Sequence, residues 1–353
     1  MSRTEPAEGE APDGPACRIR ADQPATTWSG GTPGALSAAQ PSRAFCRPPR
    51  AERPLSPRSA ALPAADRATP DDGISKSGNT PELDREDVGQ GDALVIAAGD
   101  GQGVVVDAGP DPRLVDDCLT ELGVSRIPLV VLTHFHADHV RGLPGVLDGR
   151  QVAAVQTTGL QEPPEQAEFV RRTVAAARIP VLRAVAGERR RIGPLDWQVL
   201  WPPPPPPPPP PVVWPLVSMP LPLPLPPEPN DASVTMLVRA AGGVSLLLLG
   251  DLEPPAQQAL LRAHPDLPAV DVLKVAHHGS ARQDAELLER VRPRLALVSA
   301  GRDNSYGHPA PRTVAALDDG GAAVLSTAEH GAIAVTAGEH GLRAVPRGPP
   351  TAP

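Results

Sequence analysis

Short runs of apolar residues alternate with amphipathic stretches along the chain from Val88 onward. The runs have the length and the valine, leucine and isoleucine content of β-strands, and they are Ala93–Ala97, Val104–Asp107, Leu129–Thr133, Val152–Thr157, Val181–Val185, Val234–Arg239, Val244–Gly250, Val270–Val275, Leu295–Ser299 and Ala322–Thr327. Stretches typical of helices fall between many of them, near 112–122, 165–177, 254–263, 283–292 and 311–318. Strands interleaved with helices, with tight turns such as Gly242-Gly243 between adjacent strands, predict an α/β domain with mixed sheets.

The two ends of the chain lack this patterning. Residues 1–83 mix alanine, proline, arginine, serine, aspartate and glycine with neither helical nor strand periodicity. A segment of this kind cannot bury enough apolar area to offset the entropy lost on ordering. We therefore predict a disordered segment at 1–83, a folded domain at 84–345 and a disordered tail at 346–353.

A proline tract interrupts the predicted domain. Pro202–Pro211 is an unbroken run of ten prolines, and the proline-rich stretch continues to Pro229. Such a run forms a stiff left-handed rod of ~3.1 Å per residue, and it has no backbone N–H groups with which to join a sheet. We interpret 202–229 as a surface insertion between two strands; a docking site for a proline-binding partner is the alternative.

Composition narrows the picture further. Aromatic residues make up only 2% of the chain, so valine, leucine, isoleucine and alanine must pack the core. The net charge of −8 is not that of a typical nucleic-acid binder, although bound divalent cations reverse the local field at a site. Cys17, Cys46 and Cys118 have no CxxC spacing, which indicates neither a disulfide framework nor a cysteine-based metal site.

The chain contains no apolar run near the ~18 residues of a membrane-spanning helix. Its N-terminus has no apolar stretch typical of a secretory signal. We therefore expect a soluble protein, cytoplasmic or associated with a membrane through a partner.

The run His134-Phe-His136-Ala-Asp138-His139 directly follows the apolar strand Pro128–Leu132. His134 and His136, two apart in an extended segment, project to the same side. Asp138 and His139 open the next helix and can face a second position nearby. Three imidazoles and a carboxylate suit Zn²⁺, and also Mn²⁺ or Fe²⁺. The alternative, a polar loop without metal, would bury several imidazoles that each need a partner.

Two further strand ends carry candidate ligands. Asp251 follows the apolar run Ser245–Leu249, where a charge is costly unless it is paired or bound to metal; a helix N-cap is the alternative. His277 and His278 follow the strand Val270–Val275. Adjacent side chains usually diverge, so we expect one to bind metal, with His277 favoured, and the other to meet the substrate.

Other polar residues suit supporting roles. His308 lies in a loop bounded by glycine and proline, close to Tyr306, the only tyrosine of the chain. It can donate to a substrate oxyanion or phosphate, with Ser280 and Asn304 as helpers; an ordinary turn residue is the alternative. Asp107 ends an apolar strand and can orient the histidine loop, although a turn aspartate is equally consistent.

The HxHxDH run resembles the signature of the metallo-β-lactamase superfamily, and the later motifs resemble the C-terminal domain of ComEC-type DNA-internalisation proteins. The matching elements, in chain order, are Val88-Gly-Gln-Gly-Asp92-Ala93, Val106-Asp107-Ala-Gly109, the HxHxDH run, Asn230-Asp231-Ala-Ser233, Leu249-Gly250-Asp251, Lys274-Val-Ala-His277-His278-Gly279-Ser280 and Tyr306-Gly307-His308-Pro309. The resemblance implies an αββα sandwich, in which two mixed β-sheets are flanked by helices.

The resemblance also implies roles for these residues. One or two Zn²⁺ or Mn²⁺ ions are expected on His134, His136, Asp138, His139, Asp251 and His277, with Asp251 bridging two ions. Asp138, His278 and His308 are expected to be catalytic. Ser280, Asn304, Tyr306 and Arg141 are candidates for substrate binding, and Asp107, Asn230 and Asp231 for structural support.

The parts together predict hydrolysis by metal-activated water. The ComEC-like pattern implies cleavage of a phosphodiester, with DNA during uptake as substrate. In that family the domain is fused to a polytopic membrane part, so a membrane channel protein is an expected partner. Two alternatives remain open: a hydrolase of carboxylic esters, lactones or thioesters, and a metal-poor remnant that binds DNA or a partner without turnover.

Two departures from the family pattern bear on the metal site. Many members supply a third histidine to the first metal, but this chain has no histidine between His139 and His264. The first site would then hold only His134, His136 and Asp251, with help from Asn230 or Asp231. Arg141 stands where a glycine commonly follows the motif.

Basic residues offer three further candidate contacts for an anion. The cation of Arg141 could hold an anionic substrate near the metals or repel the metals slightly. Arg171-Arg172 and the run 189–191 could contact phosphates, but solvated surface charge is the simpler interpretation of both.

Overall fold

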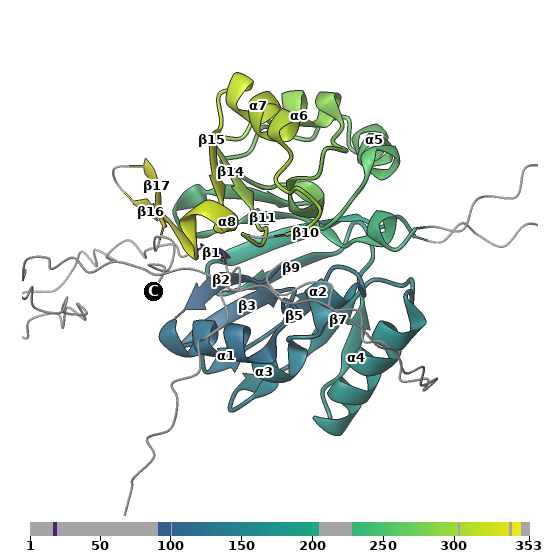
Figure 1. Cartoon of the computed structure of the whole chain (residues 1–353). Helices are drawn as coiled ribbons and strands as arrows, with labels where there is room; N and C mark the ends of the chain where they lie inside the picture. The colour runs from purple at the N-terminus through teal and green to yellow at the C-terminus, as the bar shows by residue number, and fades with distance from the viewer. Residues whose placement is uncertain are drawn as a thin grey trace, which may run out of the picture. The chain divides into compact units, whose positions relative to one another are not determined.

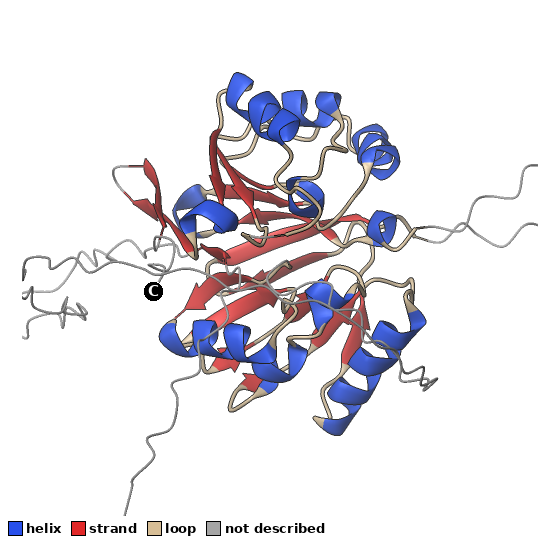
Figure 2. Ribbon diagram, viewed as in Figure 1, coloured by secondary structure: helices blue, strands red, loops and turns tan. Residues whose placement is uncertain are grey.

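A computed structural model of the chain describes residues 17–19, 91–99, 101–204, 228–302, 304–338 and 341–346. All of them belong to one unit, formed by Met1–Pro24 and Arg85–Pro353. Two β-sheets lie face to face in this unit, and helices cover the outer face of each (Figures 1 and 2).

The first sheet has the strand order β17-β16-β1-β2-β3-β5-β7-β8, with β4 and β6 attached at β3. Its strands are β1 (Cys17–Ile19), β2 (Leu94–Gly99), β3 (Gln102–Val106), β4 (Arg126–Ile127), β5 (Val130–Leu132), β6 (Gln151–Val152), β7 (Val155–Thr157), β8 (Val181–Arg183), β16 (Ile333–Gly338) and β17 (Gly341–Pro346). Strands β3, β5, β7 and β8 are parallel, so helices make the crossovers between them. These helices are α1 (Pro112–Glu121), α2 (Ala137–Val140), α3 (Leu143–Leu147) and α4 (Pro164–Ala176).

The second sheet has the order β15-β14-β13-β12-β11-β10-β9. Its strands are β9 (Arg189–Ile192), β10 (Leu195–Trp201), β11 (Thr235–Arg239), β12 (Ser245–Leu248), β13 (Val272–Lys274), β14 (Leu295–Val298) and β15 (Ala323–Ser326). Strands β9 to β12 are antiparallel and β12 to β15 parallel. The associated helices are η1 (Asn230–Ala232), η2 (Ala241–Gly243), α5 (Pro254–Ala263), η3 (Ala276–Gly279), α6 (Ala285–Val291), α7 (Pro311–Asp319) and α8 (Thr327–His330).

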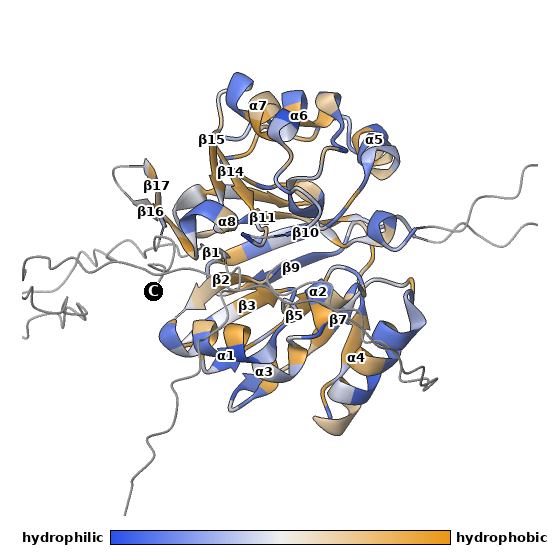
Figure 3. Cartoon of the chain, viewed as in Figure 1, coloured by the Kyte–Doolittle hydropathy of each residue, from blue (hydrophilic) through white to orange (hydrophobic). Residues whose placement is uncertain are grey.

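Strand β12 shows how the core is divided. Leu246 and Leu248 point into the cluster between the two sheets, whereas Leu247 and Leu249 pack under α5 and α6. Because the strand is buried on both faces, its sequence is continuously apolar rather than alternating. Figure 3 shows a similar pattern in much of the unit, with apolar strands such as β3 and β14 inside and polar patches on the outer helices, whereas β9 is hydrophilic.

The predicted αββα sandwich is confirmed, and the predicted apolar runs coincide with strands to within a few residues. The sequence analysis missed the hairpin β9–β10 because β9 consists of three arginines and an isoleucine, which carries no apolar signal for an edge strand. Strand β1 lies within the segment expected to be disordered, and it pairs with β2 and β16. The rest of that segment and residues 205–227 of the proline tract lie outside the described residues.

None of the described helices is long and apolar enough to span a bilayer.

Candidate metal centre

Loops that leave four strands meet at one edge of the two sheets. Asp107 follows β3 and His134 lies just beyond β5, both in the first sheet, whereas Asp251 and His278 follow β12 and β13 of the second. Since β3 runs parallel to β5 and β12 to β13, the carboxyl ends of each pair lie on the same side of their sheet. Side chains far apart in the sequence therefore converge.

The backbone at this edge adopts conformations that are rare for L-residues. Asp107, His277 and His278 have φ angles of 58°, 49° and 53°, in the left-handed region that costs a non-glycine residue free energy. Gly250, with φ of 56°, precedes Asp251, and a Cβ there would come within 2.7 Å of Ser233 Cβ. Such conformations cluster at functional sites, where the surrounding structure holds them in place.

A first cluster contains His134, with His136 against it and Asp251 facing it; His134 and Asp251 also lie at metal-ligand spacing from His139. The Nε2 atom of His134 lies 3.0 Å from Nδ1 of His136 and 4.0 Å from Oδ2 of Asp251. On its other side, Nδ1 of His134 contacts the hydroxyl oxygens of Thr133 at 3.1 Å and Ser233 at 3.4 Å. The predicted convergence of residue 251 with the histidine run is thus present in the structure.

A second cluster contains Asp138, His139 and His278, and shares Asp251 with the first. The Nε2 atom of His139 lies 3.7 Å from Asp138 Oδ2 and 3.3 Å from Asp251 Oδ2. The Nε2 atom of His278 lies 3.1 Å and 3.4 Å from the same two oxygens. Two imidazole nitrogens and two carboxylates therefore face one point.

The two nitrogens at this point face carboxylate oxygens but make no hydrogen bond in the described part of the chain. His139 Nε2 and His278 Nε2 are buried without such a partner, and so is Oδ1, the second oxygen of Asp251. Buried polar atoms without a partner are costly and uncommon in folded proteins. Nitrogen and carboxylate oxygen donors at this spacing suit a divalent transition metal, so the residues present fit a metal site.

Two groups fix the imidazoles of the second cluster. Asp107 accepts hydrogen bonds from the backbone N–H and the hydroxyl of Thr133, at 2.7 and 2.8 Å, and its Oδ2 lies 2.9 Å from His139 Nδ1. The Nδ1 atom of His278 lies 3.0 Å from the carbonyl oxygen of Ser299. A proton held on each Nδ1 leaves Nε2 as the atom available to a metal.

A third group of possible ligands in the same region includes Asp92, which forms an ion pair with a lysine. Asp92, Asp107 and His139 also lie within metal-binding distance of one another. The buried ammonium of Lys274, however, lies 2.5 Å from Asp92 Oδ2 and donates to the carbonyl of Val275 at 3.0 Å. Burial opposes ionisation of Asp92, but Lys274 and then His278 lower its pKa to about 2. The negative charge of Asp92 is therefore neutralised by Lys274.

The pKa values divide the histidines into two types. Burial, with the charge of His139 second, places the pKa of His134 well below its ordinary value, and burial also lowers that of His136. Burial opposes the protonation of His139 and His278 as well, yet Asp251 and its neighbours raise their pKa values well above the ordinary value. Protons on these two rings offset the buried carboxylates, and a bound metal would replace them.

His277, which the sequence analysis favoured as a ligand, lies apart from both clusters. Its Nδ1 is 3.3 Å from Glu253 Oε1, and Glu253 also pairs with Arg282 at 2.7 Å. The two left-handed residues at 277 and 278 turn their side chains in different directions, with ring planes 68° apart. The structure therefore places His278, rather than His277, among the carboxylates.

His308 lies beside both histidines. Its ring centroid is 6.3 Å from that of His278, with nearly parallel planes, and 5.7 Å from that of His277. Tyr306, half exposed, stacks on His308 at 5.8 Å. Burial, followed by the charges of His278 and His277, lowers the pKa of His308 to about 4, so its imidazole is neutral at pH 7.

The other predicted residues mainly hold loops. Asn304 accepts from the backbone N–H of His308 at 2.9 Å and donates to its carbonyl at 2.6 Å. Ser280 is buried, and its hydroxyl accepts from the backbone N–H of Arg282 at 3.3 Å. Asp231 accepts from the backbone N–H of Glu253 at 3.1 Å.

Asn230 and Arg141 make fewer contacts that bear on the metals. Asn230 Oδ1 is buried without a hydrogen-bond partner among the described residues. Arg141 is exposed, and its Nε donates to Gln166 at 3.2 Å. The glycine that the backbone requires is Gly142, one residue later, because a Cβ there would lie 1.9 Å from Ala108 O.

Sequence reasoning passed over three residues that matter for this geometry. Ser233 accepts from the backbone N–H of Asp251 at 3.0 Å and contacts His134, so it supports the first cluster where Asn230 and Asp231 were expected. Asp92 and Lys274 lie within quoted motifs, but only their pairing across the two sheets reveals them.

Comparison with known proteins agrees with the family resemblance seen in the sequence motifs. The family model described as the metallo-beta-lactamase superfamily matches residues 87–302. The chain is 27% identical over 270 residues to ComE operon protein 3 of Bacillus subtilis, a match that covers 70% of this chain and 32% of that protein. It is 34% identical over 83 residues to competence protein ComA of Neisseria gonorrhoeae, covering 23% and 12%.

Among solved structures, Zn²⁺-bound PqqB from Methylobacterium extorquens superposes with a TM-score of 0.42 at 14% identity, covering 66% of this chain and 84% of that one. The chain spans about a third or less of the length of the two curated relatives named above.

Proposed function

The chain belongs to the metallo-β-lactamase superfamily, and we propose that it is a metal-dependent hydrolase that cleaves phosphodiester bonds of DNA. It is related to competence proteins and carries a buried cluster of histidines and aspartates. The observation that carries the proposal is the convergence of His139 Nε2 and His278 Nε2 on Asp251 Oδ2, at 3.3 and 3.4 Å. Both nitrogens, and the other oxygen of Asp251, are buried and make no hydrogen bond with any described residue.

Each cluster has a defined set of proposed ligands. His134, His136 and Asp251 would hold one ion, and Asp138, His139, His278 and Asp251 a second; Zn²⁺ and Mn²⁺ both suit these donors. A divalent cation there would act as a Lewis acid and lower the pKa of a bound water from 15.7 to about 7.

The side chains themselves would do the remaining work. Asp138 is partly open to solvent, and although burial opposes its ionisation, His139 and His278 lower its pKa below the ordinary value. It can therefore accept a hydrogen bond from the attacking water and orient it. The neutral ring of His308 can donate an N–H to the oxygen that gains charge on the substrate.

The surroundings of the centre favour an anionic substrate over an acyl group. Arg141 is exposed two residues after His139, and Arg282 pairs with Glu253, which also contacts His277. The rings of His277, His308 and Tyr306 lie beside His278 and one another. Of the large hydrophobic side chains exposed in the described residues, Tyr306 is the one beside the centre. A phosphodiester matches such polar surroundings better than an ester that needs an apolar pocket.

The cellular role is proposed from the relatives. One curated relative is named as a competence protein and the other as a protein of the ComE operon, so DNA taken up by a cell is the proposed substrate. A polytopic membrane protein is the proposed partner.

An assay of the purified chain with added Mn²⁺ or Zn²⁺ tests the proposal. Single-stranded DNA and bis-p-nitrophenyl phosphate should be hydrolysed, and acyl-lactones should not. Hydrolysis of the lactones alone would identify an ester or lactone hydrolase of the same fold. Metal analysis of the same sample tests the third possibility: metal far below one ion per chain, with no turnover, would indicate a non-catalytic remnant that binds DNA or a partner.

A further inference from the structure

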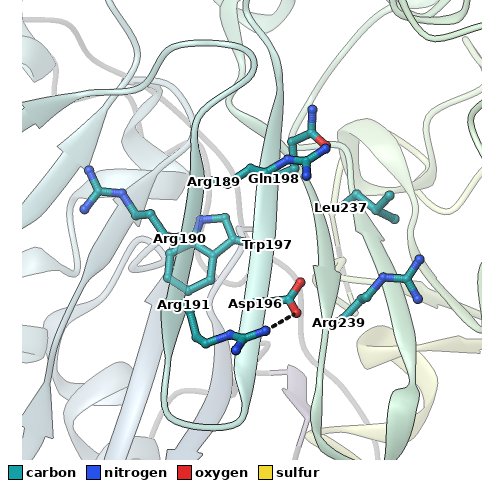
Figure 4. A pocket seen from close by; sticks show the side chains of 8 residues that line it. All are labelled: Arg189, Arg190, Arg191, Asp196, Trp197, Gln198, Leu237 and Arg239. Carbon is teal, nitrogen blue, oxygen red and sulfur yellow. Dashed lines mark hydrogen bonds and ion pairs between the residues drawn. The ribbon is translucent and has the colours of Figure 1, made fainter.

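A second concave site lies on the second sheet, separate from the metal centre. It is a cavity of about 500 Å³ at the edge formed by β9, β10 and β11. Arginines from two segments of the chain gather around it, as Figure 4 shows. The residues that line it are Arg189, Arg190, Arg191, Asp196, Trp197, Gln198, Leu237 and Arg239.

Strand register places most of these side chains on one face. Asp196 pairs with Arg191 on one side and with Arg239 on the other, and residues directly opposite in a sheet point the same way. Gln198 is likewise opposite Arg189 and Leu237. Three strands thus present two parallel rows of side chains.

The remaining two lining residues belong to the opposite face. Trp197 is buried in the core between the sheets, and Arg190, which pairs with it in register, donates to Glu188 at 2.6 Å. The run 189–191 is therefore not a uniform basic stretch, because strand alternation separates the middle arginine from the other two.

The face is strongly cationic within an acidic chain. Arg189, Arg191 and Arg239 are exposed, and Asp196 is the one acidic side chain that lines the cavity. Its carboxylate lies 3.6 Å from Arg191, and Arg189 donates to the neutral Gln198 at 3.2 Å. Three guanidinium groups against one carboxylate stand out in a chain of net charge −8.

We propose that this arginine cavity binds the phosphates of a single-stranded nucleic acid whose scissile bond lies in the metal centre. The inference rests on the proposed function for the identity of the strand. Arginine matches phosphate geometry with paired N–H donors. Arg189 and Arg191, two residues apart on one strand, lie about 7 Å apart along it, so they can engage successive groups of an extended polyanion.

The shape of the site favours a nucleic-acid strand over a membrane surface. The site is concave, which suits a threaded strand better than a flat bilayer surface.

Strand β11 links the cavity rigidly to the metal centre. Ser233, two residues before the strand begins, contacts His134, whereas Leu237 and Arg239 line the cavity. At about 3.4 Å per residue, the cavity lies about 14 to 20 Å from Ser233 along the strand direction. A stacked strand of nucleic acid rises ~3.4 Å per nucleotide, so about four to six nucleotides would bridge the two sites.

The test compares two variants of the full chain that remove equal charge. One carries Arg189→Gln, Arg191→Gln and Arg239→Gln; the control carries Arg171→Gln, Arg172→Gln and Arg312→Gln, exposed arginines of α4 and α7. Binding of a fluorescent oligothymidylate of about 20 nucleotides is followed by anisotropy against salt concentration without added metal. Each phosphate contact on a single strand contributes about −0.7 to the slope of log K against log salt.

The cavity variant should lose about two units of that slope, and at least tenfold in affinity at low salt, whereas the control should match the unaltered chain. Equal slopes for all three proteins would overturn the proposal. The proposal would also be overturned if the cavity variant lost binding to phosphatidylglycerol vesicles while its binding of oligothymidylate was unchanged. That result would identify a membrane surface as the ligand instead.

Turnover separates this inference from the proposed function. With Mn²⁺, the cavity variant should hydrolyse bis-p-nitrophenyl phosphate at the unaltered rate and show a raised KM only for strands longer than about four to six nucleotides. A chain that hydrolyses neither substrate, yet shows the slope difference, would refute the nuclease proposal and leave the binding site standing. An equal rise of KM for short and long strands would contradict the cavity assignment.

Discussion

The two halves of the metal centre share Asp251 but differ in what holds their imidazoles. In the second cluster, His139 is fixed by the carboxylate of Asp107 and His278 by a backbone carbonyl. In the first, the described residues place two hydroxyl groups against Nδ1 of His134, and His136 contacts His134 directly.

This difference teaches that the two positions should not bind metal equally well. A carboxylate bonded to the far side of an imidazole fixes its tautomer and orientation and increases its basicity. Hydroxyl groups can donate as well as accept, so they orient a ring less strictly. Together with the missing third histidine, this predicts a tight second site and a weaker first site.

The largest effect should come from the residue that both clusters share. Asp251→Ala removes a carboxylate from each cluster and should abolish turnover. This loss is greater than the ~10–100-fold loss of metal affinity or activity that is typical when a residue hydrogen-bonded to a metal ligand is removed. Because the sheets do not depend on metal, the far-UV circular dichroism should be unchanged. Metal content and hydrolysis of bis-p-nitrophenyl phosphate measure the outcome. Full activity of this variant would refute the whole arrangement.

Single-histidine variants should distinguish the clusters. His278→Ala should remove the tightly held ion, whereas His136→Ala should remove only the weaker one; both should abolish turnover. Titration with a competing chelator, read by metal analysis, separates the two losses. His277→Ala is the matched control, because His277 contacts Glu253 rather than the clusters, and its metal content should equal that of the unaltered chain. Equal metal loss in all three would contradict the assignment of His278.

The supporting groups should show the same asymmetry on a smaller scale. Asp107→Asn should weaken metal binding by about 10–100-fold. Ser233→Ala removes a neutral hydroxyl, whose hydrogen bonds contribute ~1 kcal/mol, or about fivefold.

A control aspartate outside the centre separates metal affinity from stability. Asp271 accepts from the backbone N–H and the hydroxyl of Ser245, at 3.0 and 2.9 Å, in the same manner as Asp107. Asp271→Asn should lower the melting temperature without changing metal affinity. If Ser233→Ala proved more damaging to metal binding than Asp107→Asn, the ranking of the two clusters would be reversed.

The smallest effect is expected from the proline tract. Strands β10 and β11 pair directly on either side of it, with Trp201 opposite Thr235. Replacing residues 205–227 with a short glycine linker should therefore leave metal affinity, turnover and the melting temperature unchanged. A variant that fails to fold would show that the tract packs against the domain.

Local spacing predicted part of the centre well. His134, His136, Asp138 and His139 lie within six residues after one strand, so their proximity depends on a single loop. For Asp251 the residues alone left a metal ligand and a helix N-cap equally open, and the family resemblance implied the metal. The strand β9 could not be predicted, since an edge strand of arginines has no apolar periodicity.

The sequence by itself determined the layered α/β architecture and the candidate ligands, because burial of apolar strands and the donor chemistry of histidine and aspartate are local properties. Only the tertiary structure decided which of His277 and His278 lies among the carboxylates, since left-handed backbone conformations set their directions. It alone paired Lys274 with Asp92 and brought Arg239 beside Arg189 and Arg191. Contacts between distant segments depend on strand order and register, which no short stretch of sequence encodes.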